Sequence, residues 1–551
     1  MRVAIVGAGP SGLTAIKICL DYGLQPVCFE RSDQIGGLWY YREKVIPGRS
    51  TVMKSTVINT SKEMTAYSDF PPRRDLPNFM HNTQLMNYLQ EYADQFQLIK
   101  HVHFNTEVIK VKKSVDHAKN GHWMIETKNT ITSEVELNDF EAVLLCSGHH
   151  CHPYMPNFKG LHTEFHGKVM HSMEYRRPDG FDDKRVLVVG MGNSACDIAT
   201  EIKGFCVFSN LDGFLFLPLQ VFLSTRRGAW TFTRTFHCGY PYDVLLLTRF
   251  SNFICRWFPT VASRYLEFSL NSRFDHVLYS LKPKHNVFQA HPTLSDDLHS
   301  RLSSQMVVIK PDVCEFGRNS VKFTDASEES DIDTVILCTG YQIAFPYAEE
   351  NILSINNNEI ALFKNMYCPQ LNHPETLAVI GLVQPWGSIL PISEMQCRLA
   401  CHLLANKQKL PPRAIMEREV QEKQAENAQR YVRSQRHTIQ VDYVPYLDEI
   451  SQMIGTKPNL WKYWRTDPKL AFHILFGPCL PYQYRLEGIH AWHGARDAIL
   501  NVWDRIQYPT QTRQITASPF KYDITLIPSS VAVLLLIILT PIWIVLLVSL
   551  W

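Results

Sequence analysis

The stretch from Phe165 to Glu201, FHGKVMHSMEYRRPDGFDDKRVLVVGMGNSACDIATE, decides the fold of this chain. Its second half places an apolar strand, Arg185–Val189, before the turn Gly190-x-Gly192-x-x-Ala195 and a helix-forming run. The first glycine permits a tight turn, and the second lets the backbone approach a phosphate. The small third residue lets the helix pack on the strand, and the helix N-terminus attracts an anion. The stretch therefore predicts the pyrophosphate turn of a dinucleotide site.

The chain carries the same pattern near its start. An apolar strand, Arg2–Val6, leads into GAGPSG at residues 7–12, a helical pattern to about Tyr22, and a second strand, Pro26–Phe29. Glu30 ends that second strand, where a carboxylate accepts hydrogen bonds from ribose hydroxyls and repels a 2′-phosphate. The first site is therefore predicted to bind FAD or NAD, not NADP.

The second site ends its corresponding strand with the opposite charge. The strand Val221–Thr225 is followed by Arg226 and Arg227. Because a guanidinium can pair with a 2′-phosphate, this site is predicted to prefer NADPH to NADH. Two solvated surface arginines are the alternative reading.

The spacing in the two units is unequal. Gly7 precedes Glu30 by 23 positions, whereas Gly190 precedes Arg226 by 36. The excess falls within the apolar run Gly204–Gln220. A loop insertion beside the second site, a segment that touches a membrane and an artefact of gene prediction are all open at this point.

The predicted fold class is α/β, with two Rossmann-like dinucleotide-binding domains, the second inserted in the first. Strands at Ala142–Gly148 and Val335–Gly340 both close with Cys-Ser/Thr-Gly, which suggests that the chain leaves and re-enters one domain. We assign residues 1–155 and 331–445 to the first domain, 156–229 and 296–330 to the second, 230–295 to a helical insert, and 446–520 to a C-terminal region. Within the first domain, residues 56–72 read as a strand and a polar turn, and 412–440 as a charged helix.

Composition excludes several classes of protein. The 551 residues suffice for two or three domains, and a formal net charge of +2 gives no indication of a nucleic-acid partner. Fourteen cysteines are scattered without CxxC or zinc spacing, so no metal site is predicted. Disulfide reductases are set aside because no CxxxxC pair lies beside the first helix.

The C-terminal stretch Ile524–Trp551 contains no Asp, Glu, Lys, Arg or His. Because about 20 apolar residues span a bilayer, we expect a transmembrane anchor over residues 524–551, with a buried soluble helix as the alternative. The first strand begins at Arg2 and leaves no room for a signal peptide. A terminal anchor of this kind places the globular part on the cytosolic side.

The residues resemble the animal flavin-containing monooxygenases. The resemblance rests on GAGPSG, Glu30, GGLW at 36–39, Asn59 within NTSKEM, FHGKVMHSMEY at 165–175, GMGNSACD and STRRGAW. It covers residues 2–510 and the hydrophobic tail. The segments STRRGAW, SQRHTIQ and FGPCLPY are most similar to the fifth mammalian form of the family. That form is associated with ketone oxygenation rather than broad amine N-oxidation.

The resemblance implies two sets of cofactor contacts. FAD is expected at Gly7, Ala8, Gly9, Pro10, Ser11, Gly12, Glu30, Leu38, Trp39, Asn59 and Thr60. NADPH is expected at Ile58, Asn59, Gly190, Gly192, Ser194, Ala195, Cys196, Asp197 and Arg226. Asn59, whose amide offers a donor and an acceptor together, is the expected catalytic residue. His171 and Tyr175 are expected to brace the structure, not to donate protons.

The implied function is oxygenation by FAD, NADPH and O2 at an endoplasmic reticulum membrane. NADPH reduces FAD, and a C4a-hydroperoxyflavin oxygenates soft nucleophiles, amine nitrogen or sulfide sulfur, of small lipophilic xenobiotics. Insertion into ketones is an alternative reaction of the same flavin adduct. An NADPH oxidase that releases hydrogen peroxide and a non-catalytic membrane-tethered flavoprotein are the alternative functions, and a homo-oligomer is one of the open assembly states.

Overall fold

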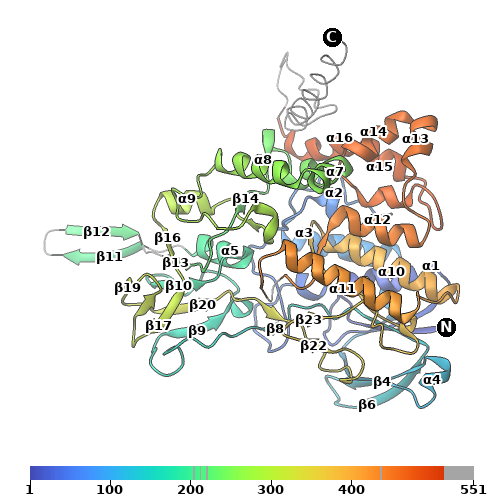
Figure 1. Ribbon diagram of the computed structural model, residues 1–551. Helices are drawn as coiled ribbons and strands as arrows, with labels where there is room; N and C mark the ends of the chain where they lie inside the picture. The colour runs from blue at the N-terminus through green and yellow to red at the C-terminus, as the bar shows by residue number, and fades with distance from the viewer. Residues whose placement is uncertain (203–204, 211–212, 219–220, 435–436, 514–551) are drawn as a thin grey trace, which may run out of the picture. The chain divides into compact units, whose positions relative to one another are not determined.

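A computed structural model describes residues 1–202, 205–210, 213–218, 221–434 and 437–513 (Figure 1). The chain forms two compact units. Among the described residues, the first contains those within 1–59, 79–234 and 263–442, and the second contains 60–78, 235–262 and 443–513. Both predicted dinucleotide turns lie in the first unit.

A five-stranded parallel sheet forms around the N-terminal strand of the first unit. Its strand order is β24-β7-β1-β2-β3. The central strand pairs in register with its neighbours, so that Val6 lies opposite Phe29 on one side and Leu145 on the other. The strands are β1 (Arg2–Val6), β2 (Gln25–Phe29), β3 (Val102–His103), β7 (Ala142–Leu145) and β24 (Leu377–Val379). The helix predicted to follow β1 is α1 (Pro10–Asp21).

A second five-stranded parallel sheet repeats this plan, with the order β16-β13-β10-β20-β9. Here Val189 at the end of the central strand lies opposite Ser224 and Leu337. The strands are β9 (Lys168–His171), β10 (Val186–Val189), β13 (Val221–Ser224), β16 (Val307–Lys310) and β20 (Thr334–Leu337), and α5 (Asn193–Glu201) follows β10. The predicted class, α/β with Rossmann-like parallel sheets, is confirmed.

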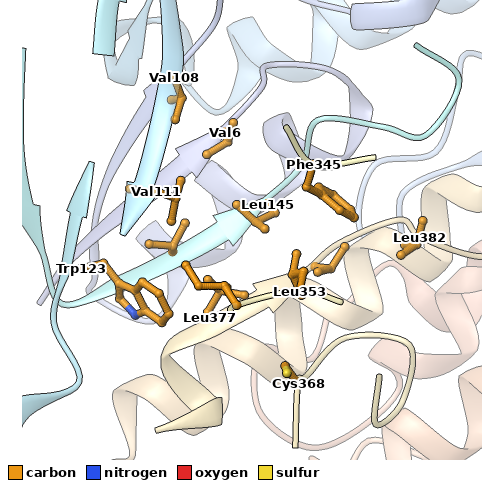
Figure 2. Packing of buried hydrophobic residues seen from close by; sticks show 14 of the residues in the cluster. Val6, Val108, Val111, Trp123, Leu145, Phe345, Leu353, Cys368, Leu377 and Leu382 are labelled. Carbon is orange, nitrogen blue, oxygen red and sulfur yellow. The ribbon is translucent and has the colours of Figure 1, made fainter. Parts of the chain in front are cut away.

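Each parallel sheet carries a small antiparallel sheet on one face. Because strand side chains alternate in direction, Ala4 and Val6 of β1 face one side while Val3 and Ile5 face the other. Val6 and Leu145 share a buried cluster with Trp123 and Val111 of the covering sheet (Figure 2). That covering sheet consists of β4 (Thr106–Lys113), β5 (Trp123–Asn129) and β6 (Val135–Phe140).

The second parallel sheet is covered in the same way. On one face, Leu187 and Val189 pack with Phe316 and Phe323 in a buried cluster. These phenylalanines belong to a sheet of β17 (Val313–Phe316), β18 (Val321–Phe323) and β19 (Glu328–Glu329). On the other face, α5 and α9 (Leu298–Ser303) contribute to a cluster with β10 and β13. The two halves therefore share one architecture.

The second sheet is inserted in the first. All its strands lie in the sequence between β7 and β24, which belong to the first sheet. One part of the expectation is wrong: β20, which overlaps the predicted strand Val335–Gly340, does not return to the first sheet but pairs with β10. Its ending resembles that of β7 because both strands flank the central strand of their own sheet. The boundary at residue 331 therefore falls too early.

The extra residues between α5 and β13 form a hairpin of β11 (Phe205–Asn210) and β12 (Gly213–Pro218) (Figure 1). These strands pair with each other and form a separate two-stranded sheet. β13 nevertheless lies beside β10, as β2 lies beside β1. The unequal spacing is thus a local insertion that leaves the order of the sheet unchanged.

Two predicted segments differ from the structure. Residues 56–72 form no strand: a single bridge joins Val57 to His81, and the short helix α2 (Lys62–Thr65) follows. Asn59 lies between them, in a bend. The charged helix expected over 412–440 is shorter, α11 (Arg413–Arg430). Within the first unit, the long helix α10 (Ile389–Ala405) packs against α1.

The expected insert 230–295 is helical but belongs to both units. It contains α6 (Tyr242–Leu246), α7 (Arg249–Trp257) and α8 (Pro259–Asn271), and the boundary between the units falls within α8. The second unit adds α12 (Tyr443–Met453), α13 (Leu460–Thr466), α14 (Pro468–Phe476), α15 (Ala495–Leu500) and α16 (Val502–Gln507).

Buried ion pairs hold the second unit together. Glu63 is fully buried and lies 2.9 Å from Lys62 Nζ and 3.0 Å from Arg505 Nε. Arg249 pairs with Asp448 at 2.6 Å. Because a buried charge without its partner is costly, these pairs fix how the helices of this unit meet.

The predicted anchor at 524–551 lies outside the described residues. Within the described part of the chain, no helix combines the length and apolar character that crossing a bilayer requires.

Candidate functional site

The first glycine turn is built by close contacts that exclude side chains. Gly7 has φ +99°, and a Cβ added there would lie 2.9 Å from the carbonyl oxygen of Cys146. A Cβ on Gly12 would lie only 1.8 Å from the carbonyl oxygen of Gly7. Glycine is therefore required at both positions, and α1 begins directly against the end of β1.

Glu30 lies beside this turn, as predicted. Its Oε2 accepts a hydrogen bond of 2.8 Å from the backbone N–H of Ala8, and its Oε1 accepts bonds from the backbone and hydroxyl of Ser32. The carboxylate is buried and fixed in orientation. It presents negative charge at the strand end where a ribose would lie.

The stretch GGLW passes close to the same turn. Gly37 has φ +54°, and a Cβ added there would lie 3.1 Å from Cα of Gly9. The N–H of Gly36 donates to the carbonyl of Ala8 at 3.0 Å. Gly37 is thus explained by contact between backbones, whereas Gly36 has φ +96° and a Cβ there would lie 2.4 Å from Sδ of Met86. Leu38 and Trp39 are partly exposed, not buried in the core.

Two further predicted residues, Pro10 and Ser11, lie in the first helical turn. Pro10 is the first residue of α1, where no backbone N–H is needed. The hydroxyl of Ser11 donates to Ser393 of α10 at 3.0 Å. The glycine turn, Glu30 and the GGLW stretch therefore meet at the carboxyl end of β1.

The second glycine turn copies the first. Gly190 has φ +127°, and a Cβ there would lie 2.5 Å from the carbonyl oxygen of Cys338. Gly190 N–H donates to Ser224, as Gly7 N–H donates to Phe29. Cys338 closes β20 as Cys146 closes β7, so the two turns rest on equivalent strands.

The helix after this turn carries the other predicted residues of the second set. Gly192 is the N-cap of α5 and has an extended backbone. Ser194 is exposed, whereas Ala195 and Cys196 are fully buried, and burial raises the pKa of the Cys196 thiol. Burial also raises the pKa of Asp197 to about 6, and the positive charge of Arg234 opposes that shift.

Arg226 lies two residues beyond the end of β13, at the edge of the sheet where the second turn lies. Its side chain is exposed. The neighbouring Arg227 donates instead to the backbone carbonyl of Arg433 at 3.3 Å. Because Gly190 N–H donates to Ser224 as Gly7 N–H donates to Phe29, Thr225 is the counterpart of Glu30, and Arg226 follows it by one residue with the opposite charge to Glu30.

Asn59 is held by an arginine that the sequence analysis did not identify. Nη2 of Arg234 donates to Oδ1 of Asn59 at 3.0 Å and to the carbonyl of Val57 at 3.2 Å. Nε of the same guanidinium donates to the carbonyl of Ile58 at 3.1 Å. Ile58 itself is buried and donates its N–H to Met80. One guanidinium therefore binds three successive residues of the loop.

Asp296 connects Arg234 to the second turn. Its carboxylate accepts from the backbone N–H and from Nη1 of Arg234, both at 2.8 Å. Asp296 follows β15 (Thr293–Leu294), and the hydroxyl of Thr293 donates to Met191 at 2.7 Å. Leu294 N–H donates to Asn193 at 2.9 Å. The Asn59 loop and the second turn are thus linked within one unit.

The whole chain matches one protein family. A family model described as "Flavin-binding monooxygenase-like" matches residues 1–546. Flavin-containing monooxygenase 5 of Rattus norvegicus is 46% identical over 517 residues, which is 93% of this chain and 94% of that protein. The chain belongs to the flavin-containing monooxygenase family. It is therefore an oxidoreductase of the monooxygenase type, with FAD and NADPH as its cofactors.

Solved structures support the fold of this flavin-containing monooxygenase. A structure of S-allyl-L-cysteine S-oxygenase from Allium sativum has a TM-score of 0.59 at 21% identity, covering 93% of this chain and 98% of that one. A crystal structure of OTEMO in complex with FAD and NADP has a TM-score of 0.57 at 15% identity, covering 82% and 97%. At these identities the likeness concerns the fold alone.

The motif Phe165-x-Gly167-x-x-x-His171-x-x-x-Tyr175 braces the second half of this monooxygenase. His171 is fully buried, and its Nδ1 accepts from the N–H of Met173 at 3.1 Å. Nε2 therefore carries the proton and donates to the carbonyl of Gly340, also at 3.1 Å. Burial lowers the pKa of His171 to about 4, so the ring is neutral near pH 7.

Tyr175 is also buried, and its hydroxyl donates to Glu201 at the end of α5 at 3.2 Å. Burial raises the pKa of this phenol far above its usual value. Both motif side chains are thus engaged with the protein itself, and the expectation that they brace the structure is confirmed.

Thr60 is the predicted site residue that opens the second unit. It is buried, and its hydroxyl shares a hydrogen bond of 2.8 Å with Thr65. The next residue, Ser61, donates its N–H and hydroxyl to the buried Asp243 at 2.6 and 3.0 Å. The chain that follows Asn59 is therefore tied down within the second unit.

Proposed function

We propose that this chain is an NADPH-dependent FAD monooxygenase that forms a C4a-hydroperoxyflavin and oxygenates soft nucleophiles, the nitrogen of amines and the sulfur of sulfides. Its substrates are small lipophilic xenobiotics. When bound and reduced, FAD supplies the activation of dioxygen. Oxygen insertion into ketones is a second reaction open to the same cofactor, and measuring products from matched amine, sulfide and ketone substrates decides the balance.

The observation that carries the proposal is a contrast of charge in the residues that follow corresponding strands of two like sheets. In the first half, Glu30 ends the strand beside the glycine turn, and its carboxylate is fixed by Ala8 and Ser32. In the second half, Arg226 follows the corresponding strand. A carboxylate suits the free ribose of FAD and an arginine suits the 2′-phosphate of NADPH, so we assign the first turn to FAD and the second to NADPH.

The residues of the chain have three tasks in this reaction. The glycine turns let the backbone approach the two pyrophosphates, and Ala195 provides the small third residue in the second turn. Asn59 acts by hydrogen bonding near the reacting oxygen. The enclosing protein excludes water, which would otherwise release the activated oxygen as peroxide.

The experiment that tests this function measures products per NADPH. The purified enzyme is supplied with NADPH, oxygen and a tertiary amine or a thioether, and oxygenated product and hydrogen peroxide are counted separately. We expect oxygenated product to account for most of the NADPH consumed. Peroxide equal to the NADPH consumed, with no oxygenated product, would favour an NADPH oxidase. A protein that purifies without flavin would contradict both.

We propose further that residues 524–551 anchor the enzyme in the endoplasmic reticulum membrane, with the catalytic part in the cytosol. The support is the run of 28 residues without a charged residue or histidine at this end of the chain. Ending the chain at residue 523 should release the enzyme from sedimented membranes while FAD remains bound. A truncated protein that still sediments with membranes in high salt would refute the anchor.

A further inference from the structure

The guanidinium of Arg234 has a fixed set of partners. It donates to Asn59 Oδ1 and to the carbonyls of Val57 and Ile58, and its fourth bond is to Asp296. Only 12% of the Arg234 side chain is exposed. Because Asp296 accepts from both the backbone and the side chain of Arg234, the guanidinium has little freedom to turn away from the loop.

This contact determines which end of the Asn59 amide is engaged. An arginine side chain has donors and no acceptor, so only the oxygen of an amide can face it. Oδ1 is therefore directed to Arg234, and the amino group, Nδ2, is directed away. Among the described residues, none accepts a hydrogen bond from Nδ2. From the sequence alone, the Asn59 amide could act as a donor or as an acceptor. In the structure its acceptor is bonded to Arg234, and its donor is the group that remains for a ligand.

We propose that Arg234 is a positioning residue that holds the Asn59 amide with its NH2 group free, so that Asn59 serves the reaction as a hydrogen-bond donor to an oxygen atom. This inference rests on the proposed function, because that function assigns Asn59 to the oxygen chemistry. A donor stabilises an oxygen that carries negative charge, whereas an acceptor in its place repels it. Without Arg234, the amide can flip, and the acceptor can take the place of the donor.

A purely structural role would give a different result. Arg234 also binds the backbone of Val57 and Ile58, and losing those bonds can shift the loop whatever side chain occupies position 59. The two roles separate when the amide itself is removed. An orienting arginine matters only while an amide is present, whereas an arginine that supports the backbone matters in every background.

The test is a double-mutant cycle of Arg234→Met and Asn59→Ala. FAD content, the absorbance spectrum of the bound flavin and the ratio of peroxide to oxygenated product are measured for the wild type, both single variants and the double variant. We expect Arg234→Met to raise the peroxide ratio about tenfold, the change that the loss of one charge-assisted hydrogen bond produces. In the Asn59→Ala background, Arg234→Met should have no further effect.

Two further variants complete the design. Asn59→Asp keeps an oxygen facing Arg234 but replaces the donor with a second acceptor, so it should retain FAD, melt no lower than the wild type and lose oxygenation. Arg185→Met is the matched control, because Arg185 pairs with Glu329 at 3.0 Å at the opposite end of β10 from the glycine turn. It should leave the peroxide ratio unchanged.

Three outcomes are distinct. A wild type that yields no oxygenated product contradicts the proposed function itself. A wild type that oxygenates, with an Arg234→Met effect that is equal in both Asn59 backgrounds, overturns the orienting role. Full oxygenation by Asn59→Asp would likewise overturn it, since that variant has no donor at position 59.

Discussion

At the scale of single residues, Arg226 offers the sharpest test of cofactor choice. Replacing it with alanine should raise KM for NADPH by about 10- to 100-fold, because a charge-assisted bond to the 2′-phosphate is lost. KM for NADH, which lacks that phosphate, should change little. Steady-state kinetics with both coenzymes measure this difference.

Arg227 is the matched control for this substitution. It is equally exposed and adjacent in the chain, but its side chain donates to the backbone carbonyl of Arg433. Arg227→Ala should therefore leave the preference for NADPH in place. Equal losses with NADPH and NADH in the Arg226 variant would remove Arg226 from the phosphate site.

Asp197 predicts a dependence of stability on pH. Burial raises its pKa to about 6 in the folded protein, well above the usual value near 3.8. As pH rises from about 4 to 6, the unfolded state loses this proton while the folded state still holds it. The free energy of unfolding therefore falls over this range. Asp197→Asn should therefore stabilise the protein at pH 7 by up to about 3 kcal/mol.

The same comparison supplies its own control. Near pH 4 the folded protein carries a neutral side chain at position 197 in both the wild type and the Asn variant, so their stabilities should lie much closer together than at pH 7. Denaturant unfolding at pH 4 and pH 7 measures the difference. A stability gap that is the same at both values would show that the ionisation of Asp197 is not its cause.

What the sequence predicts at this scale depends on distance along the chain. Glu30 lies 22 positions from Ala8, and the two meet because a local βαβ pattern brings them together. Arg234 lies 175 positions from Asn59, and no local pattern joins them. Arg234 follows β14 (Thr231–Phe232), which pairs with β15, and both strands are too short to give a periodic signal.

At the scale of elements, the hairpin β11–β12 should be dispensable for binding. Among the residues that the structure describes, its strands pair only with each other, and β13 keeps its register with β10. Replacing residues 203–220 with a short Gly/Ser linker should leave FAD content unchanged and shift the free energy of unfolding by less than about 1 kcal/mol, because loop length has a weak effect on stability.

NADPH kinetics of the linker variant decide whether the hairpin serves the second site. We expect KM for NADPH to stay within about twofold of the wild type, far below the change expected for Arg226→Ala. A KM that rises as far as in Arg226→Ala would mean that the hairpin contributes directly to cofactor binding.

Strand and helix positions near the glycine turns were predictable, because an apolar strand, a glycine turn and a helix form one local pattern. The strand expected within residues 56–72 does not exist. Val57 makes a single bridge to His81, and α2 begins at Lys62, so the apolar residues of this stretch are buried without a ladder. Tertiary contacts decide the conformation there, and propensity alone does not.

At the scale of the whole molecule, two similar strand endings predicted correctly that one sheet is inserted in the other. They also led to a wrong assignment, because β20 was expected in the first sheet and belongs to the second. β7 and β20 look alike because each flanks the central strand of its own sheet. Their similar sequences therefore show that they occupy equivalent positions in the two parallel sheets, and not that they belong to one domain. The first sheet is completed only later, by β24.

The central claim is that two like sheets bind FAD and NADPH for oxygen transfer. The most direct test reduces the FAD-bound enzyme with NADPH under anaerobic conditions and mixes it with oxygenated buffer in a stopped-flow spectrophotometer, without substrate. The account predicts an oxygenated flavin that persists and decays rapidly once a tertiary amine or a thioether is added. A direct return to oxidised flavin, with one peroxide per flavin and no effect of either substrate, would contradict it.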